Sequence, residues 1–261
     1  MSTIINPRAI VSPKAQLGEN VSIGPFTIVE DEAVIGEGTH VGANVLIASG
    51  ARIGKECRIH HGAVLATAPQ DLKYRDEPTT LEIGDNTVIR EYATLNRGTH
   101  DRWKTIVGSH CFIMAYVHVA HDCEIGDHVI LANGVNMAGH VVIEEHAIIG
   151  GVTPIHQFVR IGRHSMIGGG FRVPKDVPPY VLAGQEPLVF QGLNIVGLKR
   201  RNFSSEAIGA LENAYRLLYQ SRLNVTQAIE RIKAEIPQTE EVRYIVDFVT
   251  MSKRGIIGSR R

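Results

Sequence analysis

The chain repeats with a period of six residues, and an aliphatic side chain opens each repeat. The series runs unbroken through Ile5, Val11, Leu17, Ile23, Val29, Ile35, Val41, Ile47, Ile53, Ile59 and Leu65. It resumes at Ile83, Ile89 and Leu95, and again from Val107 to Val173. Four residues after each aliphatic residue stands a small or β-branched one, such as Ala9 or Thr27. A period of six fits neither a helix nor an ordinary strand, and it is typical of the hexapeptide coils of a parallel β-helix.

Each hexapeptide of such a fold forms one face of a three-sided prism, so three hexapeptides make one coil. Residues one coil apart, such as Ile5 and Ile23, stack on each other. Successive coils lie ~4.8 Å apart, the spacing of neighbouring strands. The aliphatic residue fills the interior. The residue four positions later also points inward near a corner, where only a small side chain fits.

Two polar segments interrupt the repeat, at about residues 68–80 and 99–105. Each occupies a whole number of hexapeptides, and the second contains Trp103, the only tryptophan. We therefore expect two loops that leave the prism without disturbing its phase. Loops on a rigid scaffold often carry binding groups; the alternative is a pair of tolerated surface insertions.

The repeat ends after Val173, and helical patterns follow. Pro178 and Pro179 interrupt the last coil. Ser204 or Ser205 is a candidate helix cap, Asn224 a second, and residues 240–252 fit a third helix. We predict a β-helix over residues 1–184 and a small α-helical domain over residues 185–261.

Composition narrows the function classes. Lys and Arg number 27, as do Asp and Glu, so the net charge is zero and general nucleic-acid binding is disfavoured. Residues 185–261 carry a charge of +4, which suits either an acidic partner or a solvated helical surface. Neither a signal segment nor a membrane span is expected. Cys57, Cys111 and Cys123 occupy small inward positions, which predicts buried thiols rather than disulfides, and a cytoplasmic protein.

The coil register gathers histidines that are distant in the sequence. His121, Gly139 and Gln157 follow one another at intervals of one coil and should stack on one corner, and Asp122 should stack on His140. The cluster on three adjacent coils then comprises His118, His121, Asp122, His140, His156 and Gln157.

Three explanations of this cluster compete. It could be a set of polar surface residues, or imidazole ligands of Zn²⁺, or an acid–base site. A neutral imidazole can take a proton from a hydroxyl group when a carboxylate orients it. Asp122 and Gln157 favour the acid–base site, and Gly139 would allow a backbone N–H to approach a developing oxyanion.

The whole chain resembles the bacterial UDP-N-acetylglucosamine O-acyltransferases, the family that begins lipid A biosynthesis. The motifs that carry the resemblance are QDLKY at 70–74, HVAHDCEIGD at 118–127, MAGHV at 137–141, HQFVRIG at 156–162, DVPPYV at 176–181 and GLNIVGLKRRNFS at 192–204. Single hexapeptides are shared by many acyltransferases, but these six motifs in this order are specific.

The resemblance implies left-handed coils and a homotrimer with active sites between subunits. It implies transfer of an R-3-hydroxyacyl chain from acyl carrier protein to the 3-hydroxyl of UDP-N-acetylglucosamine, without a cofactor or a metal. His121 matches the general base, Asp122 its orienting partner and the Gly139 amide the oxyanion donor. Residues matching substrate contacts are Gln70, Asp71, Lys73, His118, His140, His156, Gln157, Asn194, Arg200 and Arg201.

Two residues depart from the family pattern. Val196 stands where an acidic residue is expected, which puts one nucleotide contact in doubt. Phe171 is large where a hexapeptide needs a small residue, and it lies beside the expected acyl groove. Gly169 matches the position that limits acyl-chain length in the family.

Other activities fit the pattern less well. One is an N-acyltransferase acting on a 3-amino sugar nucleotide, another a metal-dependent hydratase, and a third a non-catalytic scaffold. The preferred acyl length, and the choice between oxygen and nitrogen at C3 of the acceptor, are not fixed by the sequence.

Overall fold

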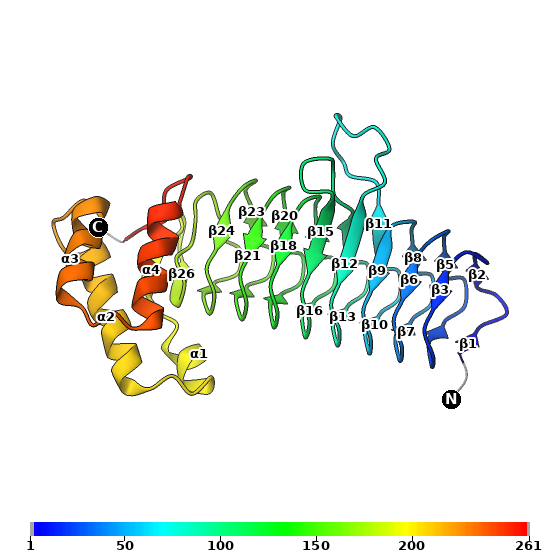
Figure 1. Ribbon diagram of the computed structural model, residues 1–261, viewed down its shortest axis with the longest axis horizontal. Coiled ribbons are helices and arrows are strands. Elements are labelled where there is room, and N and C mark those ends of the chain that lie inside the picture. Colours follow the sequence, from blue (N-terminus) through cyan, green and yellow to red (C-terminus); the bar gives the residue numbers. More distant parts are fainter. Residues whose placement is uncertain (1–2, 260–261) are drawn as a thin grey trace.

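The computed structural model describes residues 3–259, which form a left-handed parallel β-helix with helices gathered at its C-terminal end (Figure 1). Three sheets make the three faces of the prism. The first sheet contains β1 (Ile4–Ile5), β4 (Ser22–Ile23), β7 (His40–Val41), β10 (Arg58–Ile59), β13 (Val88–Ile89), β16 (Phe112–Ile113), β19 (Ile130–Leu131), β22 (Ile148–Ile149), β25 (Met166–Ile167), β26 (Val181–Gly184), β27 (Val189–Leu193) and β28 (Gly258–Ser259).

The other two faces are shorter sheets. The second contains β2 (Ile10–Val11), β5 (Ile28–Val29), β8 (Leu46–Ile47), β11 (Val64–Thr67), β14 (Thr94–Asn96), β17 (His118–Val119), β20 (Asn136–Met137) and β23 (Pro154–Ile155). The third contains β3 (Gln16–Leu17), β6 (Val34–Ile35), β9 (Ala51–Ile53), β12 (Thr80–Ile83), β15 (Lys104–Val107), β18 (Glu124–Ile125), β21 (Val142–Ile143) and β24 (Arg160–Ile161).

The strand register confirms that both loops preserve the phase of the repeat. Ile5 pairs with Ile23, three hexapeptides further along the chain. Leu65 pairs with Leu95, and Leu95 pairs with Val119. The separation of Leu65 from Leu95 exceeds one coil by two hexapeptides. The separation of Leu95 from Val119 exceeds one coil by one hexapeptide. Each loop therefore adds a whole number of repeats, and the prism continues through both insertions as one stack.

The loops are slightly shorter than predicted. β12 begins at Thr80 and β15 begins at Lys104, so Thr80, Lys104 and Thr105 belong to strands. Both loops project from one edge of the prism, side by side (Figure 1). His100 of the second loop lies 3.7 Å from Glu77 of the first, measured between Nδ1 and Oε1.

The interior is built as the repeat predicts, from one aliphatic and one small residue per hexapeptide. Val21, Ile23, Thr27 and Val29 are at most 3% exposed. The three cysteines, Cys57, Cys111 and Cys123, are also buried and form no disulfide, as expected.

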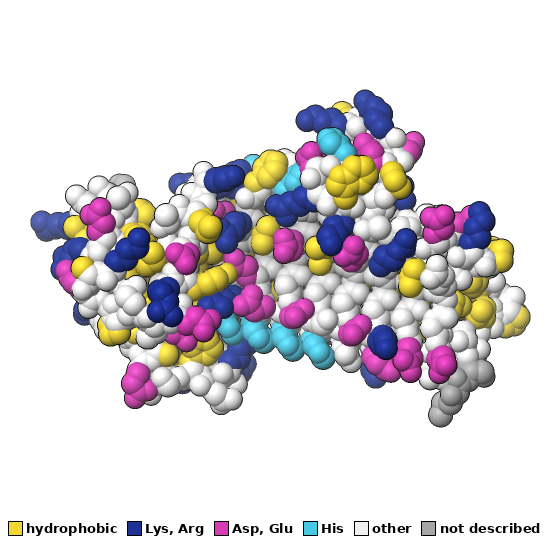
Figure 2. Space-filling model, viewed as in Figure 1, with side chains coloured by type: hydrophobic (Ala, Val, Ile, Leu, Met, Phe, Trp, Pro, Cys, Tyr) yellow, Lys and Arg dark blue, Asp and Glu magenta, His cyan; other side chains and the backbone are white. Residues whose placement is uncertain are grey.

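The corners of the prism use the left-handed backbone region. Asp122, His140 and Phe158 occupy one corner, here called the His140 corner, with φ of 59°, 62° and 66°. Asp and His tolerate this region better than most residues. A second corner carries His110, His128, His146 and His164, whose rings stack with centroids 4.9, 4.6 and 4.8 Å apart. This histidine column is visible along the lower edge in Figure 2.

Four helices follow the prism: α1 (Ile195–Arg200), α2 (Ser205–Gln220), α3 (Val225–Glu235) and α4 (Glu240–Met251). The predicted caps are confirmed, because the Ser204 side chain accepts from the amide of Ala207 and that of Asn224 from the amide of Gln227. The short helix α1 has no counterpart among the predicted elements. No helix within residues 3–259 is both long and apolar enough to cross a membrane.

The predicted division at residue 184 falls between β26 and β27, which pair antiparallel. The sheet thus extends beyond that position, and the first helix begins at Ile195. The domain boundary stays a prediction.

Candidate active site

His121 and Asp122 form a buried hydrogen-bonded pair in the turn after β17. Nδ1 of His121 lies 2.8 Å from Oδ2 of Asp122. His121 is 8% exposed, and Asp122 is fully buried. An ionised carboxylate only accepts hydrogen bonds, so Nδ1 is the donor and Nε2 keeps its lone pair. In this tautomer, Nε2 of His121 can accept a proton.

Two threonines hold Asp122 in place. Oδ1 accepts from the amide of Thr99 (2.9 Å) and Oδ2 from its hydroxyl (2.6 Å), while the Asp122 amide donates to Oγ1 of Thr105 (2.8 Å). Burial raises the pKa of Asp122, but hydrogen bonds from His121 and Thr99 outweigh it and lower the pKa to about 2. Neither threonine is among the residues predicted from the sequence; the only signal was their place in or beside the second loop.

Gly139 lies against the His121 ring. A Cβ at this position would stand 2.6 Å from Cε1 and 2.8 Å from Nε2 of His121, so any side chain here would force the imidazole to shift. The amide of the next residue, His140, donates to the carbonyl of His121 (3.1 Å). Within residues 3–259, the Gly139 N–H has no hydrogen-bond acceptor. This unpaired donor belongs to the residue that packs against the His121 imidazole.

His140 and His118 lie near the pair. Nε2 of His140 is 3.7 Å from Oδ2 of Asp122, and its ring stacks on Phe158. Burial lowers the pKa of His140, and Asp122 opposes the shift only in part. Nδ1 of His118 shares a hydrogen bond with Oγ1 of Thr94 (2.7 Å), and burial, then His121, lower its pKa. Both imidazoles are neutral at neutral pH.

His121, Asp122 and His140 could also contribute ligands to a metal ion, because one ligand atom of each lies within 4.8 Å of the others. The donor types suit Zn²⁺. However, the carboxylate oxygens are already hydrogen-bonded to His121 and Thr99. This arrangement favours acid–base chemistry over metal ligation.

Two family profiles match the chain. The profile described as "Udp N-acetylglucosamine O-acyltransferase; Domain 2" covers residues 176–257. The profile "Bacterial transferase hexapeptide (six repeats)" covers residues 32–67 and 104–139.

Curated relatives match over nearly the full length. The acyl-[acyl-carrier-protein]–UDP-N-acetylglucosamine O-acyltransferase of Chlorobaculum tepidum is 66% identical over 94% of this chain and 93% of its own. The protein of the same name from Thermodesulfovibrio yellowstonii is 46% identical over 97% and 98%. The chain belongs to the UDP-N-acetylglucosamine O-acyltransferase family.

Solved structures of the family have the same fold. The UDP-N-acetylglucosamine acyltransferase of Bacteroides fragilis 9343 superposes with a TM-score of 0.96 at 48% identity, covering 97% of this chain and 100% of its own. That of Francisella novicida also gives 0.96, at 37% identity, covering 99% and 95%. Neither these structures nor the two curated relatives carry the name of an N-acyltransferase or a hydratase.

The family's expected nucleotide contacts are divided between the first loop and the segment around α1. Gln70, Asp71 and Lys73 stand on the first loop, where Oδ1 of Asp71 accepts from the amide of Lys73 (2.9 Å). Gln70 and Lys73 are exposed. These side chains project with the loop, free to meet a ligand or a second subunit.

Asn194, Arg200 and Arg201 lie beside the histidine column instead. Asn194 caps α1 through the amide of Gly197, and its Nδ2 donates to the carbonyl of His164 (2.9 Å). Nη2 of Arg201 donates to the carbonyl of His146 (3.4 Å). Arg200 is exposed, as is Val196 on the same helix. The Asn194 side chain thus makes hydrogen bonds that stabilise the fold.

Gly169 and Phe171 mark the third corner, where Gly170 has a φ of 79°. Gly169 is exposed. The Phe171 ring lies close to Gly168, because a Cβ added at Gly168 would be 3.0 Å from Cε2 of Phe171. His156 is exposed, and its Nδ1 bonds to the carbonyl of Gln157. His156 and Gln157 lie one coil beyond Gly139, as the register predicts. One chain therefore distributes the expected site over three corners.

Proposed function

We propose that this protein transfers an R-3-hydroxyacyl chain from acyl carrier protein to the 3-hydroxyl of UDP-N-acetylglucosamine, the first step of lipid A biosynthesis. The observation that carries the proposal is the oriented His121–Asp122 pair beside Gly139. The Gly139 N–H donates a hydrogen bond to no residue within 3–259. The names of relatives at up to 66% identity give the substrates.

The reaction follows from the atoms of this site. Nε2 of His121 takes the proton of the sugar 3-hydroxyl, and the oxygen attacks the carbonyl carbon of the thioester. The tetrahedral oxyanion accepts a hydrogen bond from the Gly139 amide. The C–S bond then breaks, and the carrier's thiolate regains the proton from His121. General-base help contributes ~10²–10⁴ in rate, and one oxyanion donor ~10²–10³.

The direct attack requires no acyl-enzyme. The thiols of Cys111 and Cys123 are buried, and burial raises their pKa to about 11 and about 12. A protonated thiol inside the prism is no nucleophile. The hydroxyl of the acceptor is then the only attacking group that the mechanism needs.

A homotrimer with its sites between subunits would complete the arrangement. Within one chain, His121 and Gly169 lie at two corners of the prism, and Arg201 lies beside the third, where its Nη2 donates to the carbonyl of His146. A neighbouring copy can present its histidine-column corner or its Gly169 corner to the His140 corner. The family assignment supports this proposal, and the separation of the residues within one chain is its physical reason.

Replacement of the base tests the proposal. His121→Ala should reduce acyl transfer by ~10³-fold or more, with product measured by mass spectrometry, while the circular-dichroism spectrum and trimer mass stay unchanged. Supplying both the 3-hydroxy and the 3-amino sugar nucleotide distinguishes O- from N-acylation. Near-normal turnover by the folded variant would rule out His121 as the base, and loss of activity on chelation would implicate a metal.

A further inference from the structure

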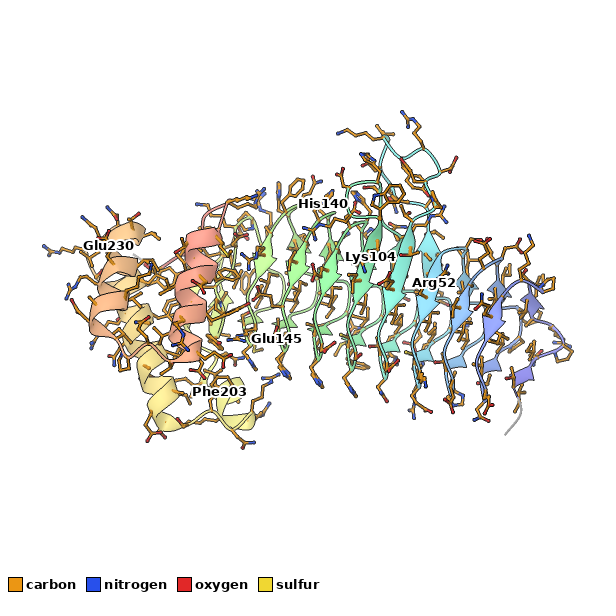
Figure 3. The ribbon with its side chains drawn as sticks, viewed as in Figure 1. Arg52, Lys104, His140, Glu145, Phe203 and Glu230 are labelled. Carbon is orange, nitrogen blue, oxygen red and sulfur yellow. The ribbon has the colours of Figure 1, made fainter. Side chains whose placement is uncertain are left out.

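An alternating row of carboxylates and imidazoles runs from the first loop to the buried Asp122. Its members are Glu77, His100, Asp101, His140 and Asp122. Nε2 of His100 lies 3.2 Å from Oδ1 of Asp101, and its Nδ1 lies 3.7 Å from Oε1 of Glu77. Oδ2 of Asp101 is 3.7 Å from Nε2 of His140. In Figure 3, His140 lies at the edge of the prism from which both loops project.

The second loop is attached to the active site through its backbone. Oδ1 of Asp122 accepts from the amides of Thr99 (2.9 Å) and Arg102 (3.3 Å). The amide of Asp101 donates to Oγ1 of Thr99 (3.3 Å), and the amide of Trp103 donates to the carbonyl of Thr99 (2.7 Å). Because Asp122 is fully buried in the prism, these hydrogen bonds fix the position of the second loop.

The part of the first loop with the expected nucleotide contacts has no such attachment. Within residues 3–259, residues 70–73 form hydrogen bonds only with other residues of the first loop. Leu72 at its tip is 97% exposed. The position of this segment relative to the active site therefore depends on how the rest of the loop is held.

Glu77 is the residue through which the second loop can hold the first. The amide of Arg75 donates to Oε2 of Glu77 (2.9 Å), and this hydrogen bond lowers the pKa of the Glu77 carboxyl. The hydroxyl of Tyr74 donates to the carbonyl of Glu77 (2.8 Å). Among residues 3–259, the contact of Glu77 with His100 is the one ion pair between the two loops.

His100 is suited to join two negatively charged groups. A protonated imidazole donates from both ring nitrogens, so His100 can bind Glu77 and Asp101 at once. The His100 and Asp101 side chains are 54% and 56% exposed, and that of Glu77 is 19% exposed. Water weakens ion pairs with this exposure, so the link should change the position of a loop without determining the fold.

We propose that His100 is a positioning residue for the acceptor nucleotide, because it holds the first loop against the second. The inference rests on the proposed function, in which Asp71 and Lys73 of the first loop contact the sugar nucleotide. His100 acts through the loop and not by contact with the substrate. Without it the loop is ordered only when the nucleotide binds, and this ordering reduces affinity.

Three variants and one control test the role of His100 in the full-length protein. His100→Asn removes the imidazole, His100→Arg keeps a cation with several N–H donors, and Glu77→Gln removes the charge of the partner. His40→Asn is the matched control, since His40 is an exposed histidine of β7 that bonds to Ser22 (2.6 Å). Thermal unfolding verifies that each variant is folded.

Two measurements are made in mildly acidic buffer, where histidine side chains take up protons. Calorimetry gives the affinity for UDP-N-acetylglucosamine. Limited digestion with trypsin, followed by mass spectrometry, gives the rate of cleavage after Lys73, which reports how often the first loop opens in the absence of a ligand.

His100→Asn and Glu77→Gln should each bind the nucleotide about three- to tenfold more weakly than the wild type, and cleavage after Lys73 should be faster by a similar factor. His100→Arg should restore most of the affinity, and His40→Asn should behave as wild type. The double variant His100→Asn/Glu77→Gln should lose no more than either single variant, because both changes remove the same contact.

Four results would overturn the proposal. These are unchanged nucleotide affinity in His100→Asn, an unchanged rate of cleavage, an equal loss in His100→Arg, and additive losses in the double variant. The outcome is also separable from that of the proposed function. If the wild type binds the nucleotide without transferring an acyl group, and His100→Asn weakens this binding, the function fails and the role of His100 stands. If the wild type transfers the acyl group and His100→Asn binds the nucleotide equally well, the role of His100 fails and the function stands.

Discussion

Thr99, in the second loop, holds the carboxylate of the proposed catalytic pair. Its amide and hydroxyl bind both oxygens of the buried Asp122 carboxylate. The carboxylate then has one orientation, and its hydrogen bond to Nδ1 of His121 fixes the orientation of the imidazole. We therefore expect Thr99 to act as a positioning residue for His121, the proposed base.

Thr99→Val should lower kcat by roughly ten- to a hundredfold, because a hydrogen bond to a charged group contributes about 1.5–3 kcal/mol. The Michaelis constants should change little, since Thr99 touches neither substrate in the proposed mechanism. Thr99→Ser keeps the hydroxyl and should restore most of the rate. Steady-state kinetics decides; equal loss in both variants, or a rise in the Michaelis constants alone, would contradict the positioning role.

At the scale of elements, the histidine column is a repeated corner whose environment changes along the prism. His110 is exposed at one end, and His164 at the other is 9% exposed between His146 and Tyr180, with Phe203 against its edge. Burial, then the charges of His146, Arg201 and Arg163, lower the pKa of His164 to about 3. Burial and Arg201 also lower that of His146.

The column should make the protein less stable in mild acid. Below pH 6.5 His164 binds a proton in the unfolded chain but stays neutral in the folded protein. The free energy of unfolding therefore falls as pH drops from 6.5 towards 3, by up to about 1.4 kcal/mol per pH unit. His164→Phe should reduce this loss between pH 7 and 5, and His110→Phe should not. Urea unfolding at fixed protein concentration measures it; identical slopes in all three proteins would contradict the prediction.

Contacts within the prism could be predicted from the sequence, whereas contacts made by the loops could not. Register alone places Gly139 on His121 and His140 on Asp122, because stacking in a prism depends only on residue count. No such rule applies to a loop, so the contact of Thr99 with Asp122 was invisible in the sequence. A cavity lined in part by Arg102, Arg160 and Lys253 could not be predicted for the same reason, since the second loop, β24 and the segment after α4 meet only through tertiary packing.

At the scale of the whole molecule, the question is whether one chain can build a complete site. His121 lies at the His140 corner, whereas α1, which carries Arg200, lies beside the histidine column, and a rigid stack of coils cannot bend to bring the two together. In a closed ring of three prisms, each cleft would combine the His140 corner of one subunit with another corner of its neighbour. Each site would then draw its base and its nucleotide contacts from different chains.

Two inactive variants should therefore restore each other. His121→Ala lacks the base, and Arg200→Ala/Arg201→Ala lacks the guanidinium groups expected to hold the diphosphate. When the two proteins are unfolded together in equal amounts and refolded, about a quarter of the clefts should pair an intact His121 with intact arginines, if subunits mix at random. Transfer at low nucleotide concentration should rise to about a quarter of the activity of refolded wild type.

The same variants refolded separately and then mixed provide the control. The triple variant His121→Ala/Arg200→Ala/Arg201→Ala, refolded together with wild type, shows whether hybrids form. If hybrids form but activity does not return, each site lies within one chain, and the arginines act elsewhere.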